Sequence, residues 1–190
     1  MRVLMIGAGG VGDAAAKIAV ERDFFDAFVV ADYDLARAQR TVAAATQRRA
    51  GERRFAAVAV DASDAEAVAA LIRSTGATHV LNAVDPRFVM PIFTGTLAAG
   101  ASYLDMAMSL SQRHPVKPFE LAHVKLGDEQ FAMAEQWSAA DQLALVGIGV
   151  EPGLSDIFAR YAQDNLFSEI DELGTRDGAN LAYYGPDGEE

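Results

Sequence analysis

Short runs of β-branched and other apolar residues alternate along this chain with longer alanine-rich runs in which apolar positions recur at helical spacing. This alternation predicts parallel strands joined by crossover helices, with both faces of the sheet covered. We expect strands over residues 2–6, 27–31, 56–60, 78–81, 101–104 and 143–148. We expect helices over residues 11–21, 35–50, 65–73, 89–99, 128–140 and 154–165. The predicted fold class is therefore α/β, a doubly wound parallel sheet.

Several short segments separate these elements. Ser63 or Asp64 is expected to cap the helix that begins at residue 65, and Gly100 ends the helix over 89–99. Residues 108–126 contain two prolines and no clear period, so a loop is expected there. His79 falls inside a strand pattern and is expected to be a buried core histidine.

The composition is that of a packed globular protein, with 51% apolar and 23% charged residues among 190. This length suits one domain, or one domain and part of another. Cysteine is absent, which excludes disulfides, thiol catalysis and zinc sites built on thiolates. No apolar run reaches the roughly 18 residues of a membrane span, so a cytoplasmic protein is expected.

Charge is distributed unevenly along the chain. The formal net charge is −11, yet residues 1–127 carry a net +1 and residues 128–190 a net −12. Nucleic-acid binding depends on neutralising phosphates with Lys and Arg, so this balance argues against a nucleic-acid partner. An acidic last third is typical of a solvated face or an acidic tail.

Residues 7–12 read Gly-Ala-Gly-Gly-Val-Gly, which matches G-x-G-x-x-G between the first strand and the first helix. Gly7 permits a tight turn, Gly9 lets a pyrophosphate approach the backbone, and Gly12 allows close packing of helix on strand. The N–H groups at the helix start, around Gly10 and Val11, are expected to hold the phosphates. In this context the motif predicts a Rossmann dinucleotide site. The alternative is a glycine-rich turn without a ligand.

Asp32 lies 20 residues after Gly12, at the end of the second strand. A carboxylate there accepts hydrogen bonds from the adenosine ribose and repels the 2′-phosphate of NADP, so NAD is the predicted cofactor. Arg37 and Arg40 are one helical turn apart and offer the opposite interpretation, because they can pair with that phosphate. Asp61, which follows the third strand, either approaches the adenine or only begins a helix-entry turn.

Other polar residues end the fourth and fifth strands. Asn82 and Ala83 fit the ribose–nicotinamide region, although an Asx turn explains Asn82 equally simply. Tyr103 and Asp105 bring a phenol and a carboxylate to the same edge of the sheet, near the expected reacting carbon. We predict these two as catalytic residues, with edge packing and loop capping as the alternative.

The loop after the fifth strand concentrates titratable side chains. Any of them suits acid–base catalysis or substrate binding, although a solvated loop has the same composition: His114, Lys117, His123 and Lys125. The sequence contains no Ser-His-Asp order, no P-loop lysine and no metal-ligand cluster, so no metal is expected.

Four segments resemble the saccharopine dehydrogenase family, which includes lysine 6-dehydrogenase-like and carboxynorspermidine dehydrogenase-like enzymes. They are GAGGVG, ADYD, HVLNAVDPRFVMPIFTGTLAAGASYLDMA and GVEPGLSDIFAR, and together they extend along nearly the whole chain. The resemblance implies a nicotinamide-dependent oxidoreductase that acts at a carbon–nitrogen bond of an amino-acid-like substrate. It also implies that Glu151, Pro152 and Gly153 border the substrate cleft, together with the Tyr103–Asp105 region.

Family members are about twice as long and carry a second α/β domain. We therefore expect a dinucleotide-binding domain over residues 1–150. Residues 151–190 are expected to be a connecting helix and the truncated start of a substrate domain, whose first strand and turn lie within 168–190. A homo-oligomer formed through the missing domain is expected, and the apolar content and the expected cleft favour a dimer.

Two other function classes stay open at this point. One is a non-catalytic NAD-binding regulatory domain of an ion channel or transporter, which shares the glycine loop and the second-strand acid. Against it stand the Asp85-Pro86 turn and the continuation through Glu151–Gly153. The other is a reductase subunit of the same superfamily that acts on a C=C bond.

Overall fold

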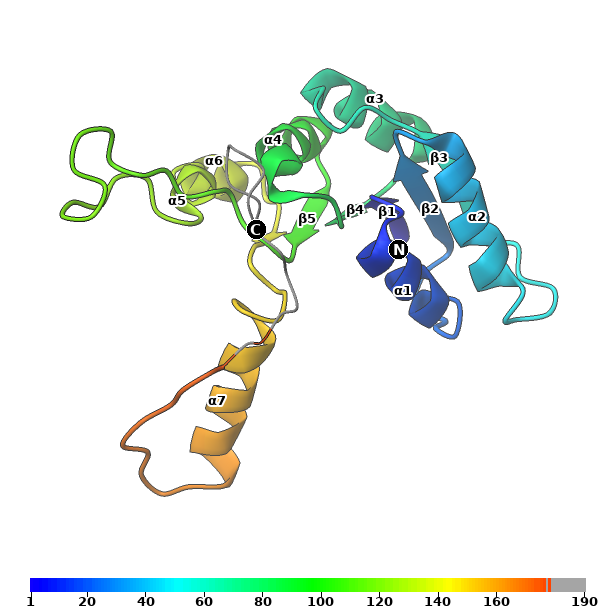
Figure 1. The fold of residues 1–190 in the computed structure, drawn as a ribbon. Coiled ribbons are helices and arrows are strands. Elements are labelled where there is room, and N and C mark those ends of the chain that lie inside the picture. Colours follow the sequence, from blue (N-terminus) through cyan, green and yellow to red (C-terminus); the bar gives the residue numbers. More distant parts are fainter. Residues whose placement is uncertain (177, 179–190) are drawn as a thin grey trace, which may run out of the picture.

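The protein forms one parallel six-stranded sheet in the order β3-β2-β1-β4-β5-β6 (Figure 1). A computed structural model describes residues 1–176 and 178. The strands are β1 (Arg2–Ile6), β2 (Ala27–Asp32), β3 (Phe55–Ala59), β4 (His79–Asn82), β5 (Ser102–Asp105) and β6 (Ala144–Leu145). At the end of β1, Ile6 lies opposite Ala31 of β2 and Asn82 of β4. β2 and β3 are thus added on one side of β1, and β4 to β6 on the other. This order confirms the predicted doubly wound sheet, with its topological switch point at β1.

Helices cover both faces of this sheet. They are α1 (Gly10–Ala19), α2 (Leu35–Thr46), α3 (Ala65–Thr75), the 3₁₀ turn η1 (Pro86–Phe88), α4 (Val89–Ala99), α5 (Asp128–Phe131), α6 (Ala134–Ala139) and α7 (Leu154–Asn165). Apolar residues of α1 and α2 pack against one face of the sheet, and those of α3 and α4 against the other (Figure 1). The crossovers therefore surround the first strands on both sides.

The first strand shows why its sequence is apolar at successive positions. Val3 and Met5 point to the face covered by α1 and α2, whereas Leu4 and Ile6 point to the face covered by α3 and α4. All four are buried, because side chains alternate across a strand and both faces are covered.

Side-chain caps fix where the crossover helices begin. Asp34 accepts hydrogen bonds from the first turn of α2, and Asp64 accepts them from Glu66 N and Ala67 N in α3. The α3 cap is therefore Asp64, while Ser63 hydrogen-bonds to Asp61. These contacts place the carboxyl-end loops of β2 and β3 firmly beside the sheet.

The last part of the sheet differs most from the sequence prediction. The helix expected over 128–140 is two short helices, because the backbone at Met133 has ψ near 7° and leaves the helical region. The strand expected over 143–148 pairs only at residues 144–145. It ends there because Gly147 takes a φ of +69°, which a strand cannot continue through.

His79 is exposed, and the expectation of a buried histidine is wrong. The α1-side face of β4, β5 and β6 carries no helix among the described residues. An open groove there is lined by strand and α1 side chains, including Ile18, Leu81 and Leu104. Since one side of β4 faces this groove, a strand pattern does not by itself imply burial.

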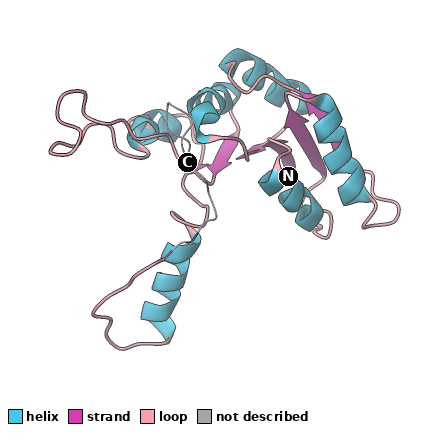
Figure 2. Cartoon of the chain, viewed as in Figure 1, coloured by secondary structure: helices cyan, strands magenta, loops and turns pink. Residues whose placement is uncertain are grey.

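Beyond β6 the chain leaves the sheet. The helix α7 stands away from the rest of the molecule, and none of its residues is buried (Figure 1). A long loop between β5 and α5 also extends outward (Figure 2). Residues 168–176 and 178 form no strand, and the rest of the strand and turn expected within 168–190 lies outside the described residues. No helix in the described part of the chain is long and apolar enough to cross a membrane.

An ion pair beside the start of β3 gives the fold an acid-sensitive contact. The Glu52 carboxylate is 2% exposed and is held by Arg54, whose Nε donates to Oε1 at 3.0 Å. Hydrogen bonding from Arg54 lowers the pKa of Glu52 from 4.5 to about 2. Because the folded-state pKa lies below the unfolded one, this stabilisation is complete above about pH 4.5 and is lost as the pH falls towards 2.

We therefore expect the unfolding free energy of Glu52→Gln to fall less than that of the wild type when the pH is lowered. Urea unfolding of the wild type and the variant, measured between pH 5.5 and about 2, checks this. The difference in unfolding free energy should shrink as the pH falls through the window between 4.5 and about 2. Glu21→Gln, at an exposed glutamate, is the matched control. Equal pH dependence of wild type and Glu52→Gln would contradict the assignment.

Candidate functional site

The glycine loop crosses the carboxyl end of the sheet between β1 and α1. Gly7 has a φ of +108°, and its N–H donates to Ala31 O at 2.7 Å. A Cβ on Gly7 would lie 2.5 Å from Ala83 O, so a side chain is excluded by backbone on the neighbouring β4 turn. Gly7 therefore ties the loop to both strands that flank β1.

The other two glycines of the motif have opposite surroundings. A Cβ on Gly12 would lie 2.0 Å from Gly7 O, so the absence of a side chain lets α1 pack onto the loop. A Cβ on Gly9 would meet nothing within 4 Å. The fold thus needs Gly7 and Gly12, whereas at Gly9 it leaves open space at the N-terminus of α1. That space is where the motif predicts a pyrophosphate.

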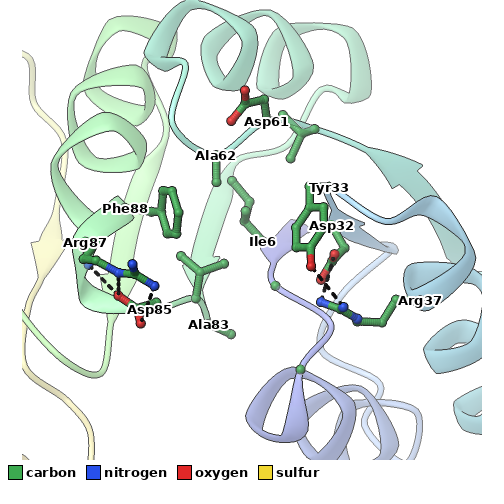
Figure 3. A pocket seen from close by; sticks show the side chains of 14 residues that line it. Ile6, Asp32, Tyr33, Arg37, Asp61, Ala62, Ala83, Asp85, Arg87 and Phe88 are labelled. Carbon is green, nitrogen blue, oxygen red and sulfur yellow. Dashed lines mark hydrogen bonds and ion pairs between the residues drawn. The ribbon is translucent and has the colours of Figure 1, made fainter. Parts of the chain in front are cut away.

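A pocket of about 400 Å³ opens beside this loop, across the ends of β1 to β4 (Figure 3). Its lining is Ile6, Gly7, Gly9, Asp32, Tyr33, Arg37, Val60, Asp61, Ala62, Ala83, Val84, Asp85, Arg87 and Phe88. Several predicted cofactor residues are therefore brought together here: Gly7, Gly9, Asp32, Arg37, Asp61 and Ala83.

Asp32 is 5% exposed and holds the glycine loop as well as the pocket wall. Its Oδ2 accepts a hydrogen bond from Ala8 N at 2.8 Å, and its Oδ1 accepts one from Asp34 N at 2.9 Å. The Arg37 guanidinium approaches Oδ1 at 3.4 Å. The carboxylate is thus oriented by the backbone of the loop that it faces, with its charge partly balanced by one arginine.

The rim of this pocket carries further charged side chains. Arg37 lies 5.0 Å from the centre of the Tyr33 ring and donates to its hydroxyl. The Ser63 hydroxyl and N–H donate to Asp61 and lower the pKa of its carboxyl group. On the opposite side, hydrogen bonding from Arg87 lowers the pKa of Asp85. The rim is therefore ionised on both sides at neutral pH.

A second pocket of about 150 Å³ lies on the β4–β5 side of the loop. It is lined by Val11, Asn82, Ala83, Val84, Val89, Asp105, Met106 and Ala107. Ala83 and Val84 border both pockets, so the two hollows adjoin along the carboxyl edge. This arrangement suits a ligand with two halves joined at the glycine loop. Gly10 and Gly12 line neither pocket.

Asn82, Tyr103, Asp105 and Gln130 form a buried hydrogen-bond network, and each is at most 2% exposed. Asn82 Nδ2 donates to the Tyr103 hydroxyl at 2.9 Å, and that hydroxyl donates to Asp105 Oδ2 at 2.9 Å. Asn82 Oδ1 accepts from Val84 N, which is the Asx-turn geometry. The Asn82 side chain therefore stabilises the turn that follows β4.

The Asp105 carboxylate receives four hydrogen bonds. Oδ1 accepts from Met108 N at 3.2 Å and Gly147 N at 2.8 Å, and Oδ2 accepts from Tyr103 and from Gln130 Nε2 at 2.7 Å. A carboxylate has about four lone-pair sites, so these donors fill it. Burial beside Asp105 raises the pKa of Tyr103. The structure brings the two predicted catalytic residues together, but in a network that joins β5 to the segments around Met108 and Gly147.

Glu151, Pro152 and Gly153 form the turn that enters α7. Gly149 N donates to Pro152 O at 2.9 Å, and Gly153 N donates to Asp156 Oδ2 at 2.9 Å. None of the three lines either of the two adjoining pockets. Their assignment to a substrate cleft stays a prediction.

The titratable loop residues lie apart from the glycine loop. The loop is closed by a bridge between Gln112 and Val124, and the His114 and His123 rings are 5.9 Å apart. Neither pocket beside the glycine loop is lined by these histidines or by the loop lysines. In the described part of the chain, no group of three or more His, Asp or Glu side chains is placed to hold a metal ion.

Sequence reasoning missed several residues of the site region. Tyr33, Arg87 and Phe88 line the larger pocket, and Gln130 completes the buried network. Arg87 and Phe88 follow the Asp85-Pro86 turn directly, so their position next to that turn was a signal in the sequence that could have identified them. Nothing in the sequence around Gln130 indicates its partners, which are 21 and 25 residues away.

Comparison with known families agrees with this geometry. Residues 3–145 match the family described as the saccharopine dehydrogenase NADP binding domain. The chain belongs to this family. The match runs from the second residue of β1 to the end of β6 and includes both pockets. The chain is thus an NAD(P)-binding domain of the saccharopine dehydrogenase-like oxidoreductases.

Two curated relatives have similar sequences. Carboxynorspermidine synthase of Vibrio alginolyticus is 29% identical over 181 residues, covering 93% of this chain and 43% of that protein. Carboxyaminopropylagmatine dehydrogenase of Synechocystis sp. is 31% identical over 175 residues, covering 90% of this chain and 40% of that protein. The chain thus spans about two-fifths of the curated relatives it matches.

The fold has counterparts among solved structures. Saccharopine dehydrogenase (L-Glu forming) of Saccharomyces cerevisiae superposes with a TM-score of 0.63 at 17% identity. The superposition covers 87% of this chain and 31% of the yeast chain. At this identity, the likeness establishes the Rossmann-type fold.

Proposed function

We propose that this domain binds NAD for an oxidoreductase that acts at a carbon–nitrogen bond of an amino-acid-like substrate. The observation that carries the proposal is the glycine loop, in which Gly7 and Gly12 are required by packing while Gly9 leaves open space beside the buried Asp32. The residues present therefore fit a dinucleotide.

The binding roles follow from position. The N–H groups at the start of α1, including those of Gly10 and Val11, face the space beside Gly9 and suit the pyrophosphate. Asp32 faces the adenosine half, and Asp61 lines the same pocket. The smaller pocket at Ala83, beside Asn82, suits the nicotinamide half.

When bound, the nicotinamide supplies a hydride donor or acceptor. The chain's own contribution is to fix its orientation. The Asn82–Tyr103–Asp105 network holds the β4 turn and the end of β5 in place, and the turn lines the pocket beside them. We assign Tyr103 and Asp105 a positioning role in the reaction, because their polar atoms are engaged inside the protein.

The names of the curated relatives support the substrate class, since each name contains a carboxylated amine compound. On this proposal, the bound cofactor would donate a hydride to the carbon of an imine, or accept one from the amine, and a proton would be exchanged at the nitrogen. The turn at Glu151–Gly153 leads from the sheet into α7, and we propose that it borders the substrate cleft. A second domain would complete that cleft and join two subunits.

The reaction class has a direct test. NADH consumption is followed with an amine plus an α-keto acid, with the keto acid alone, and with an α,β-unsaturated acid. Consumption that requires both amine and keto acid supports C–N chemistry. Consumption with the unsaturated acid identifies a C=C reductase instead. In a protein that also carries the second domain, tight NADH binding without any consumption favours a regulatory domain.

The preference for NAD is tested at Asp32. We expect Asp32→Asn to raise the ratio of NADPH to NADH affinity about ten-fold, because the substitution removes the negative charge that faces the 2′-phosphate. The substitution also alters the hydrogen bond from Ala8 N to Asp32. Any resulting change in the glycine loop affects both cofactors equally, because both contain the same pyrophosphate, so it cancels in the affinity ratio. Equilibrium titration of both cofactors gives the ratio. A wild type that prefers NADPH would overturn the assignment of Asp32.

A further inference from the structure

The larger pocket has a wall that the glycine motif does not explain. Arg87 and Phe88 belong to η1, directly after the β4 turn, and both line the pocket. The Arg87 guanidinium lies 5.8 Å from the centre of the Phe88 ring. It also pairs with Asp85, with Nε 2.9 Å from Oδ1.

The opposite wall has the same composition. Arg37 lies 5.0 Å from the centre of the Tyr33 ring and pairs with Asp32. In Figure 3 the Arg87–Phe88 pair and the Arg37–Tyr33 pair stand on opposite sides of the cavity. Each wall thus presents an arginine and an aromatic ring, and each arginine pairs with a carboxylate, Asp32 at the end of β2 or Asp85 in the turn after β4.

The space between the two walls is apolar at its base. Ile6 and Ala83 form this base, and Ala62 lies at the far end (Figure 3). A flat aromatic ring fits between such walls, because guanidinium planes and aromatic side chains both stack on π-systems. The glycine loop at the edge of the pocket fixes where the phosphates of the same ligand lie.

We propose that Arg87 binds the adenine ring of the dinucleotide face-on from the β4 side, opposite Tyr33. The proposal rests on the proposed function and adds a specificity residue from η1 to the site. The Arg87 side chain is 71% exposed, and exposed ion pairs such as Arg87–Asp85 contribute little, so the guanidinium is free to turn onto a ring. Its delocalised plane, rather than its charge alone, makes the contact.

Substitution of Arg87 by alanine and by lysine separates stacking from simple charge. Affinity for ADP-ribose and for nicotinamide mononucleotide is measured by equilibrium titration of the whole protein. We expect Arg87→Ala to bind ADP-ribose about five-fold more weakly than the wild type, the size of a partly exposed cation–π contact. Arg87→Lys should also bind it more weakly than the wild type, because an ammonium group has no plane to stack on the ring. Affinity for nicotinamide mononucleotide should not change.

Asp85→Asn is the matched control for a structural role. The asparagine oxygen keeps the cap on Arg87 N but loses the ion pair, so it leaves the guanidinium free. If Arg87 contacts adenine, Asp85→Asn should weaken ADP-ribose binding less than Arg87→Ala does. If Arg87 acts only by holding Asp85 and η1, Asp85→Asn and Arg87→Ala should weaken it equally, which would overturn the proposal.

Two further outcomes would also overturn it. Full retention of affinity by Arg87→Lys would mean that a charge near the phosphates is sufficient. An unchanged affinity in Arg87→Ala would mean that the ring binds without this wall. Failure of the wild type to bind ADP-ribose at all is a different result, because it removes the proposed function itself.

Discussion

Replacing Gly9 by valine is expected to weaken NADH binding at least 100-fold without unfolding the domain. The structure leaves a Cβ at this position without any contact within 4 Å, and Gly9 has an extended backbone with φ −75°, so a side chain here does not strain the loop. The same atoms occupy the space beside the N-terminus of α1 where the pyrophosphate would bind. A loss of that size corresponds to about 2.7 kcal/mol of binding free energy. Isothermal titration measures the affinity, and thermal unfolding measures the fold.

Two companion variants separate ligand from structure. Ala14→Val places a valine at an exposed position of α1, and it should leave both affinity and melting temperature nearly unchanged. Gly12→Ala places a Cβ 2.0 Å from Gly7 O, so it should lower the melting temperature as well as the affinity. Wild-type affinity in Gly9→Val would show that no dinucleotide lies against this loop.

Asp105→Asn is expected to lower the free energy of unfolding by about 3 kcal/mol. The carboxylate accepts four hydrogen bonds, two on each oxygen. The donors are two backbone N–H groups, a tyrosine hydroxyl and a glutamine amide. An asparagine keeps one acceptor oxygen and turns an NH₂ group towards the other two donors. Those donors are buried, and leaving them unpaired costs most of the expected loss.

Urea unfolding at neutral pH measures this loss, and Asp171→Asn, at an exposed position outside any helix or strand, is the control. Tyr103→Phe removes one hydroxyl from the same network and should cost less, about 1 to 2 kcal/mol. A loss below 1 kcal/mol in Asp105→Asn would mean that the network is not a structural support. The positioning role given to Asp105 would then be wrong.

The parts of the site that the sequence predicts are those set by local spacing. The turn at Gly7, the start of α1 and the position of Asp32 at the end of β2 all follow from one βαβ unit. Within such a unit the chain has few ways to fold, because crossover length and handedness are constrained. The strand order and the cofactor edge of the sheet were predictable for the same reason.

The parts that the sequence did not predict depend on which segments meet in space. Tyr103 and Asp105 end a strand at the cofactor edge, and that position alone resembles a catalytic pair. Their burial depends on Gln130 and Gly147, which reach them from 25 and 42 residues further along. The exposure of His79 likewise depends on the absence of a covering helix on one face of β4 among the described residues. Single-strand patterns carry no such information.

The measurement that tests the account most directly is a map of backbone amide chemical shifts during titration with NADH. We predict saturable shifts centred on residues 7–12, on Asp32 to Arg37 and on the β4 turn from Ala83 to Phe88, since these segments border the two adjoining pockets. ADP-ribose alone should change the chemical shifts of amides that border the larger pocket and leave those of Met106 and Ala107 unchanged. Saturable shifts elsewhere on the folded domain, or none at millimolar NADH, would contradict the dinucleotide site.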